Sequence, residues 1–246
     1  MTKSEIQFIR SLADKRTRTA EGVFIAEGEK LIGELLASSL RVRRLYALEG
    51  VFDRSVGAEI VTVGEMERIS QLKTANNSLA IVEIPQRNLA KVDASHSMVI
   101  ALDRVQNPGN LGTIIRLADW FGIGDIVCSH DCAECFNPKV VQATMGAIIR
   151  VNIHYTDLAA WLAERKKAAI PIYGTFLDGE NIYSAPLSEG GVIVMGNEGS
   201  GIDAQCAANI TRRLFIPPYP TDRRSCESLN VAIATAVICS EFRRRQ

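Results

Sequence analysis

Residues 98–121, MVIALDRVQNPGNLGTIIRLADWF, contain the change of pattern that decides the fold of this 246-residue chain. The run from Met98 to Leu102 is short and continuously apolar, which predicts a buried β-strand. Apolar residues then recur at helical spacing over 110–121, which predicts an α-helix. Asparagine, proline and glycine dominate the turn between them. This composition suits a phosphate cradle, a tight structural corner or a site where a ligand contacts bare backbone.

The same alternation of strand and helix continues to the C-terminus. Apolar strands are predicted at MVIAL (98–102), DIVC (125–128), IPIYGTF (170–176), GVIVMG (191–196) and RLFIP (213–217), and helices at 110–121, 138–148, 157–168, 201–209 and 228–243. Such alternation is typical of a parallel sheet with helices on both faces. Ligands bind beyond the carboxyl ends of strands in such sheets. The candidate site therefore consists of the loops NPGNLG (107–112), GNEGSG (196–201) and IPPYPTDRRSCESLN (216–230).

The part before residue 98 has a different organisation. Strand-like stretches are GVFIAEG (22–28), VRRLYAL (42–48), EIVTV (59–63) and SLAIVEIP (78–85), and EKLIGELLASS (29–39) has helical spacing. The polar stretch QRNLAKVDASHS (86–97) is typical of a linker. We therefore expect a small α/β domain over 1–85, a linker over 86–97 and a second domain over 98–246.

Charge and composition limit the partners. Lys plus Arg and Asp plus Glu both number 28, so the formal net charge is zero, and binding to nucleic acid must depend on local basic patches. No apolar run reaches the roughly 18–20 residues of a membrane span, and the first residues lack the apolar core of a signal peptide. We therefore expect a cytoplasmic protein with no membrane partner, in which the six cysteines are free thiols.

Two kinds of ligand site are disfavoured by spacing. Cys128, His130, Cys132 and Cys135 lie close together but lack a second, well-separated ligand pair, so we predict no metal site. Neither glycine-rich loop has the Gly-Lys-Ser/Thr of a P-loop or the G-x-G-x-x-G of a dinucleotide turn, which argues against a dehydrogenase. Glu198 would also repel a pyrophosphate. A loop carboxylate suits a ligand of cationic character, a sulfonium or an amine.

Arg116 lies one turn after Gly112 in the predicted helix. The stripe that we expect to be buried consists of Leu111, Ile114, Ile115, Ala118 and Phe121. Helical side chains lean toward the N-terminus, so the guanidinium is expected to pass over Gly112 toward the NPGN turn. The alternative is a structural arginine that pairs with Asp119 at i, i+3.

Together, these loops resemble the three motifs of the SpoU (TrmH-type) RNA ribose methyltransferases, within the SPOUT superfamily. NPGNLGTIIR matches Asn-Pro-x-Asn-x-Gly-x-x-x-Arg, IVMGNEGSGI matches Gly-Asn-Glu-x-x-Gly, and IPPYPTDRRSCESLNVAIATAV has the Ile-Pro start and the Ser-Leu-Asn-Val close. FNPKVVQATMGA (136–147) is similar to the family's Pro-Lys-Val-Val-x-x-Ser-x-Gly-Ala, with Thr144 in place of serine. SLADKRTRTAEGVFIAEGEKLIGELL (11–36) resembles the opening of the family's ribosomal-protein-like substrate-binding domain.

The resemblance implies methyl transfer from S-adenosylmethionine to a ribose 2′-hydroxyl. It also implies a deep trefoil knot in the C-terminal part of the parallel sheet, a homodimer, and an RNA substrate, with rRNA ahead of tRNA. An RNA-binding protein of this fold that has lost catalysis is a further alternative. The implied catalytic residues are Arg116, Asn107, Glu198, Asn230 and Ser228; the implied cofactor-binding residues are Thr175, Phe176, Leu177, Gly196, Ile216, Pro218 and Leu229; and the RNA-binding candidates are Lys15, Arg16, Arg18, Arg223 and Arg224.

The roles within this set differ. The family's arginine, here Arg116, is a base or the organiser of the target phosphate. Because arginine has a pKa above about 12, we favour phosphate positioning and electrostatic stabilisation and leave base action open. Asn107 would orient Arg116 or the ribose, or only form the turn, and Glu198 would hold Arg116, lie near the cofactor or face water. Ser228 is a plausible helix N-cap. The third motif is longer than the family's, with Pro218 in place of a methionine.

Overall fold

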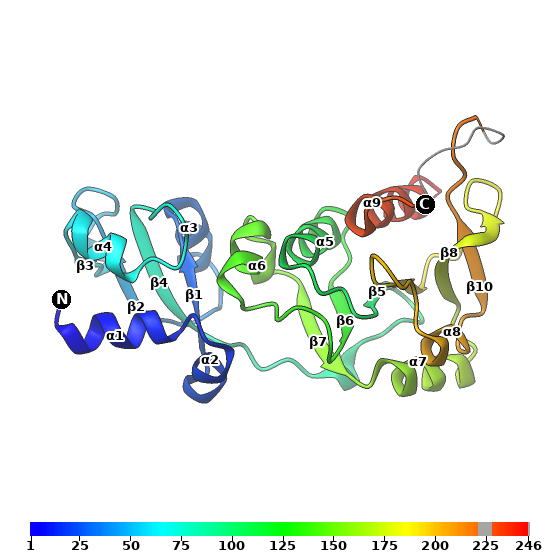
Figure 1. The fold of residues 1–246 in the computed structure, drawn as a ribbon, viewed down its shortest axis with the longest axis horizontal. Coiled ribbons are helices and arrows are strands. Elements are labelled where there is room, and N and C mark those ends of the chain that lie inside the picture. Colours follow the sequence, from blue (N-terminus) through cyan, green and yellow to red (C-terminus); the bar gives the residue numbers. More distant parts are fainter. Residues whose placement is uncertain (221–227, 246) are drawn as a thin grey trace. The chain divides into compact units, whose positions relative to one another are not determined.

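The structure is a computed structural model that describes residues 1–220 and 228–245. The chain divides into two compact units, one made of residues 1–86 and 134–149, the other of residues 87–133 and 150–246 (Figure 1). The boundaries expected at residues 85 and 97 stay a prediction. Among the described residues, no helix has the length and apolar character needed to cross a membrane.

The second unit contains a six-stranded parallel sheet, counted over the described residues. The strand order is β10-β8-β9-β5-β6-β7. The bounds are β5 Met98–Leu102, β6 Asp125–Ser129, β7 Asn152–Thr156, β8 Ile172–Asn181, β9 Gly191–Met195 and β10 Arg212–Phe215. In this register Leu102 lies opposite both Met195 and Cys128. The turn that leaves β5 therefore starts between the loops that leave β9 and β6.

The α/β class and five of these strands are confirmed, whereas β7 was not predicted. Its sequence, NIHYT, mixes polar and apolar residues, and only His154 among them is buried. β7 is an edge strand that pairs with β6 alone. An edge strand needs no continuous apolar run, so the pattern that revealed β5 and β9 is absent from it.

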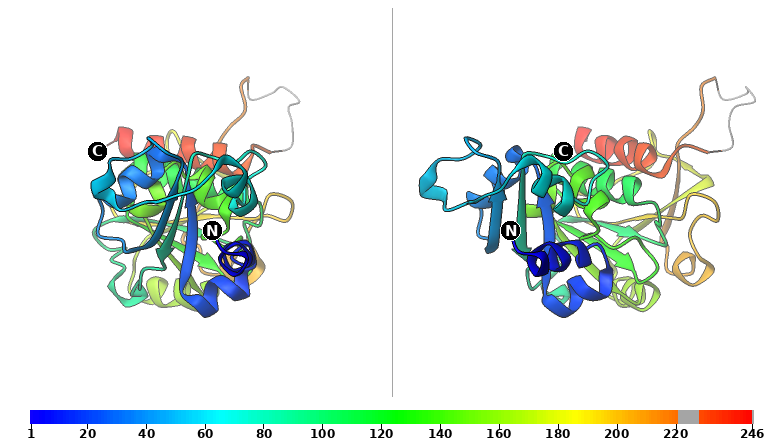
Figure 2. Two further views of the ribbon diagram at one scale, coloured as in Figure 1. Left: turned by 90° about the vertical axis from the view of Figure 1, so that its left-hand side faces the viewer. Right: turned by 60° about the vertical axis from the view of Figure 1, so that its left-hand side comes forward.

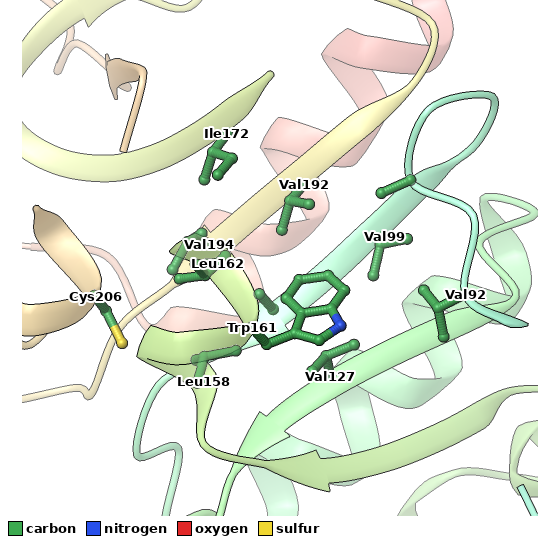
Figure 3. Close-up of a cluster of buried hydrophobic side chains, with 12 residues drawn as sticks. Val92, Val99, Val127, Leu158, Trp161, Leu162, Ile172, Val192, Val194 and Cys206 are labelled. Atoms are coloured by element: carbon green, nitrogen blue, oxygen red, sulfur yellow. The ribbon is translucent and has the colours of Figure 1, made fainter. Parts of the chain in front are cut away.

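Helices cover both faces of this sheet. Figures 1 and 2 show α5 (Pro108–Trp120) and α9 (Val231–Arg244) on one face, and α7 (Leu158–Lys167) and the short α8 (Ala204–Ala207) on the other. Valines of β5, β6 and β9 meet Leu158, Trp161 and Leu162 of α7 in one apolar cluster (Figure 3). Each such side chain contributes about 1.5–3 kcal/mol when fully buried. The strand ends are thus fixed by a packed core.

α5 forms as its sequence predicts. Its N-cap is Asn107, whose side chain accepts hydrogen bonds from the backbone N–H groups of Gly109 and Asn110, and Pro108 occupies the first turn. Four residues of the predicted stripe are fully buried, namely Leu111, Ile114, Ile115 and Ala118. Phe121, the fifth, is only half-buried. The helix therefore packs along the expected face and leaves Arg116 exposed on another.

The first unit contains a four-stranded mixed sheet in the described residues, in the order β1-β4-β2-β3. The strands are β1 Val23–Glu27, β2 Val42–Ala47, β3 Glu59–Ile60 and β4 Ser78–Glu83, and the helices before residue 86 are α1 Lys3–Ser11, α2 Lys15–Glu21, α3 Glu29–Leu36 and α4 Val63–Ile69. Three-residue 3-10 helices lie at Arg54–Val56 and, within the expected linker, at Leu89–Lys91.

The strand expected over 59–63 is too long. Only Glu59–Ile60 forms β3, and α4 begins at Val63. Thr62 caps this helix: its hydroxyl accepts from the backbone N–H of Glu65, and the Glu65 carboxylate accepts from the backbone N–H of Thr62. This capping box stops the strand and starts the helix, and an apolar pattern alone does not show it.

Residues 134–149 follow β6 in sequence but pack within the first unit. Glu134 forms an ion pair with Arg18, and the rings of Phe136 and Phe24 lie 4.8 Å apart. The segment contains α6 (Pro138–Ala143) and a 3-10 helix (Ala147–Ile149). The single helix expected over 138–148 is therefore wrong, because Met145 (φ 50°) and Gly146 (φ 96°) adopt left-handed backbone conformations that end α6.

Glu27, at the end of β1, provides a pH-dependent contribution to the stability of the first unit. Its buried carboxylate accepts hydrogen bonds from Ser70 Oγ (2.6 Å) and Gln71 N (2.7 Å). Burial raises the pKa of Glu27 above 4.5, although both hydrogen bonds oppose the shift. The folded state therefore binds the Glu27 proton more tightly than the unfolded state does, and stability decreases as the pH rises above 4.5.

Glu27→Gln is expected to remove this pH dependence, since glutamine does not titrate. The free energy of unfolding of the wild-type protein, relative to that of the variant, should decrease between pH 4.5 and about pH 8. Urea unfolding of both proteins at the two pH values measures the difference. A difference that stays constant or grows with pH would show that burial does not control the ionisation of Glu27.

Candidate active site

A cavity of about 860 Å³ lies at the carboxyl ends of β9 and β10 and against residues 175–178 of β8, within the second unit. Ligand pockets are typically about 300–1,000 Å³, so its size suits a small-molecule cofactor. All seven residues that the resemblance assigns to cofactor binding contribute to its lining: Thr175, Phe176, Leu177, Gly196, Ile216, Pro218 and Leu229. The structure thus brings together residues from four separate segments. Their role as cofactor ligands stays a prediction.

Bare backbone forms part of the cavity wall. Residues 197–201 turn back on themselves, because Asn197 and Gly201 exchange two backbone hydrogen bonds of 3.0 Å. A Cβ on Gly196 would lie 2.3 Å from the carbonyl carbon of Gly201 and 2.4 Å from the nitrogen of Ile202. Glycine is therefore required at 196, because the backbone of Gly201 and Ile202 packs directly against it.

The side-chain amides of Asn110 and Asn230 and the carboxylate of Glu198 connect the three predicted loops. Asn110 Nδ2 donates to Glu198 Oε1 over 2.6 Å, and Asn230 Nδ2 donates to Asn110 Oδ1 over 3.1 Å. These orientations satisfy both ends of the Asn110 amide. Asn110 was not among the candidate residues, although the Asn-Pro-x-Asn motif contains it. Its amide links the loops of the second and third motifs at the start of α5.

The asparagines at the loop ends also start helices. Asn107 caps α5, and Asn230 caps α9 by accepting from the backbone N–H groups of Ala232 and Ile233. The N-cap role suggested for Ser228 is therefore wrong, because α9 begins at Val231 and Asn230 is its cap. Ser228 still contributes to the cavity lining, as does Glu198.

The Arg116 side chain is exposed and, among the described residues, has neither a hydrogen bond nor an ion pair. The alternative pairing with Asp119 is wrong, since the carboxylate of Asp119 contacts Arg150 at 2.8 Å. Glu198 accepts from Asn110 and not from Arg116. Arg116 lies six residues after Asn110, a rise of about 9 Å along the helix axis. Its guanidinium is available to an anionic substrate group.

The RNA-binding candidates differ in their exposure. Lys15 and Arg16 are exposed on α2. Arg18 is wrong as a candidate, because it is 1% exposed and donates to the backbone carbonyls of Leu12 and Ala13 besides pairing with Glu134. A pattern of closely spaced basic residues does not show that one side of α2 faces the interior. Arg223 and Arg224 lie outside the described residues.

The buried thiol of Cys132 contacts the turn after β5. Cys132 Sγ accepts from Val105 N at 3.3 Å and donates to Leu102 O at 3.2 Å. Hydrogen bonding by Cys128, with a smaller contribution from Ser129, lowers the pKa of Cys132 to about 7.

No cluster of three or more His, Cys, Asp or Glu side chains arranged for a metal ion occurs in the described part of the chain.

The second unit is thus an α/β domain with a parallel sheet and a cavity at the carboxyl edge of that sheet. Residues 97–240 match the family model described as the SpoU rRNA Methylase family, and residues 3–92 match the MRM3-like substrate binding domain. The chain therefore belongs to the SpoU rRNA methylase family.

Full-length relatives agree with this assignment. The chain is 30% identical to the 23S rRNA (guanosine(2553)-2′-O)-methyltransferase RlmP of Bacillus subtilis, covering 95% of this chain and 94% of the relative. A putative RNA methyltransferase of the TrmH family from Porphyromonas gingivalis is similar in structure, with a TM-score of 0.89, 41% identity and coverage of 100% and 99%. An AdoMet-bound rRNA methyltransferase from Sinorhizobium meliloti has a TM-score of 0.87, 28% identity and coverage of 100% and 96%.

Proposed function

We propose that this protein transfers a methyl group from S-adenosylmethionine to a ribose 2′-hydroxyl of 23S rRNA. The observation that carries the proposal is the cavity against β8 and at the ends of β9 and β10, joined through Glu198 to Asn110 of the helix that bears Arg116. By its name, the Bacillus subtilis relative is a 2′-O-methyltransferase of a guanosine in 23S rRNA. The Sinorhizobium meliloti relative is described as an AdoMet-bound rRNA methyltransferase. Because the substrate is ribosomal RNA, we place the protein in the cytoplasm.

The cavity residues fit this cofactor. When bound, S-adenosylmethionine supplies an electrophilic methyl group on a sulfonium. Apolar side chains such as Leu177, Ile216 and Leu229 line the cavity together with glycine backbone, which suits an adenosine moiety. Glu198 places a carboxylate at the same wall and favours a cationic ligand. A trefoil knot in the C-terminal part of the parallel-sheet domain is part of this proposal and is supported by family membership.

Arg116 positions the substrate in this mechanism. An unpaired guanidinium is a fork of donors that binds phosphate oxygens in a fixed orientation. Such a contact would hold the 2′-hydroxyl of the target nucleotide in one orientation for methyl transfer. Asn110 is held at both ends by Glu198 and Asn230, so its part of α5 is fixed before RNA binds. Lys15 and Arg16 of the substrate-binding domain contact RNA phosphates elsewhere.

Transfer of radiolabelled methyl groups from S-adenosylmethionine to separated rRNA and tRNA fractions tests the proposed substrate. Label in the 23S rRNA fraction is the expected result. Label confined to tRNA would show that tRNA is the substrate of the proposed methyl transfer in place of rRNA. Cofactor binding without label in either fraction would favour an RNA-binding protein that has lost catalysis.

The proposed enzyme acts as a homodimer. Three apolar side chains, of α5, of α9 and of the segment after β8, are strongly exposed: Trp120 (82%), Ile233 (54%) and Tyr183 (51%). A shallow hollow of about 410 Å³ is lined by Phe121, Tyr183, Ala236, Val237, Ser240 and Glu241. Exposed apolar side chains are common at protein interfaces. A second copy of this chain is the partner that the family resemblance implies.

Ile233→Lys is expected to convert the dimer into a monomer, because it would place a charge in the apolar contact. Light scattering coupled to size exclusion measures the mass, and the wild-type protein should show two chains. Ile60→Lys, at a residue that is 61% exposed in β3 of the first unit, is the matched control and should stay dimeric. A wild-type protein with the mass of one chain would overturn the dimer.

A further inference from the structure

The turn between β5 and α5 contains a strained residue. Arg104 has a φ angle of 56°, a left-handed conformation that residues with a Cβ rarely adopt. The turn leads directly into Asn107, Pro108 and Asn110, the first residues of the site. Strain of this kind persists only where surrounding groups hold the backbone in place.

Both backbone groups of Arg104 are held by side chains from neighbouring loops. Its N–H donates to Ser129 Oγ at 2.9 Å, and its carbonyl accepts from Asn197 Nδ2 at 2.8 Å. Ser129 ends β6, and Asn197 follows β9. Asn197 is therefore the link between the strained turn and the loop of the second motif.

The adjacent residue makes a second link to the same loop region. Asp103 is 2% exposed, and its Oδ2 accepts from the backbone N–H of Asp203 at 2.6 Å. Its Oδ1 lies 3.3 Å from Arg104 Nε. The Arg104 guanidinium also reaches Gly201 O at 3.5 Å. The turn and the loop region are thus also joined by charge-assisted contacts of the Asp103 and Arg104 side chains.

The other end of the Asn197 amide organises the loop that carries Glu198. Asn197 Oδ1 accepts from Gly199 N at 2.9 Å and from Ser200 N at 3.1 Å. One amide group thus holds both residues after Glu198 and, through its nitrogen, the carbonyl of Arg104. These bonds fix the loop relative to the turn. Between the two, Asn110 Nδ2 donates a hydrogen bond of 2.6 Å to Glu198 Oε1.

We propose that Asn197 is a positioning residue for methyl transfer. Its amide keeps Arg104 in the left-handed conformation and thereby fixes the spacing between Glu198 and Asn110. Without the donor, the turn relaxes toward negative φ and carries the start of α5 away from Glu198. A displacement of about 1 Å lowers a rate by about 100-fold when catalytic groups depend on orientation. The inference rests on the proposed methyltransferase function.

The test is the single-turnover rate of methyl transfer at saturating cofactor and RNA. Asn197→Ala and Asn197→Asp are both expected to lower it by about 30- to 100-fold. Aspartate keeps the acceptor for Gly199 and Ser200 but lacks the donor for Arg104, so equal losses assign the effect to the nitrogen. Asn209→Ala is the matched control, because Asn209 Nδ2 also donates to backbone carbonyls, those of Ala159 and Gln205, away from the cavity.

A second background separates positioning from simple destabilisation. Glycine adopts positive φ without strain, so Arg104→Gly removes the need for the Asn197 donor. The loss caused by Asn197→Ala should be at least about 5-fold smaller when residue 104 is glycine. Thermal unfolding midpoints of the variants, with that of Asn209→Ala for comparison, show the loss of stability separately.

The outcomes distinguish this inference from the proposed function. Wild-type protein that transfers no methyl group to any RNA contradicts the proposed function. Active wild-type protein whose rate is unchanged by Asn197→Ala and Asn197→Asp overturns the positioning role. An equal loss with arginine and with glycine at residue 104, or an equal loss in Asn209→Ala, also overturns it.

Discussion

Arg116→Ala is expected to lower the single-turnover rate of methyl transfer by about 1,000-fold, the effect of removing a preorganised charged donor from an active site. The affinity for S-adenosylmethionine should change little, because Arg116 is not among the residues that line the cavity. The guanidinium is exposed and, in the described part of the chain, unpaired. Its removal therefore leaves no buried partner unsatisfied and should not destabilise the fold.

The measurement is the rate at saturating RNA, together with a calorimetric titration of the cofactor. Arg116→Lys is expected to recover only part of the rate, because lysine keeps the charge but lacks the planar fork. Arg87→Ala, at another exposed arginine of the same unit, is the control and should transfer methyl groups at the wild-type rate. Equal rates for Arg116→Ala and wild-type protein would remove Arg116 from the mechanism.

Gly196→Ala is expected to weaken S-adenosylmethionine binding by about 100-fold, which corresponds to about 2.8 kcal/mol. The new Cβ would lie 2.3 Å from the Gly201 carbonyl carbon, so backbone must move. Gly196 and Gly201 both line the cavity, and the displaced strand of the loop would change the shape of its wall. The methyl-transfer rate at low cofactor concentration should fall in parallel.

Gly124→Ala is the matched control for this substitution. Gly124 lies between α5 and β6, and a Cβ there meets no atom within 4 Å among the described residues. Its cofactor affinity should equal that of the wild-type protein. A dissociation constant for Gly196→Ala within about threefold of the wild-type value, a difference below 1 kcal/mol, would show that the cofactor does not depend on this wall.

Elements with a strong local pattern were predictable from the sequence. Three local signals predict the same strand, turn and helix: the apolar run of β5, the asparagine at 107 and the apolar stripe from Leu111 to Ala118. The structure has these elements at the predicted positions. β7 and the start of α4 were missed. The first is a half-buried edge strand, and the second depends on the side-chain cap of Thr62.

The site was predictable as a set of loops but not as a set of contacts. The seven residues that the resemblance implies for cofactor binding come from four segments and line one cavity, while their role stays a prediction. The role of Asn110 depends on its distances to Glu198 and Asn230, which are 88 and 120 residues away in sequence. The burial of Arg18 depends on Glu134, 116 residues away. Long-range contacts of this kind are set by packing and leave no local pattern.

The most direct test of the account is the chemical position of the transferred methyl group. RNA methylated by the wild-type protein would be digested to nucleosides and analysed by mass spectrometry, which separates ribose from base after cleavage of the glycosidic bond. The account predicts a single 2′-O-methylated nucleoside from 23S rRNA. A methyl group on the base, with the ribose unmodified, would contradict it.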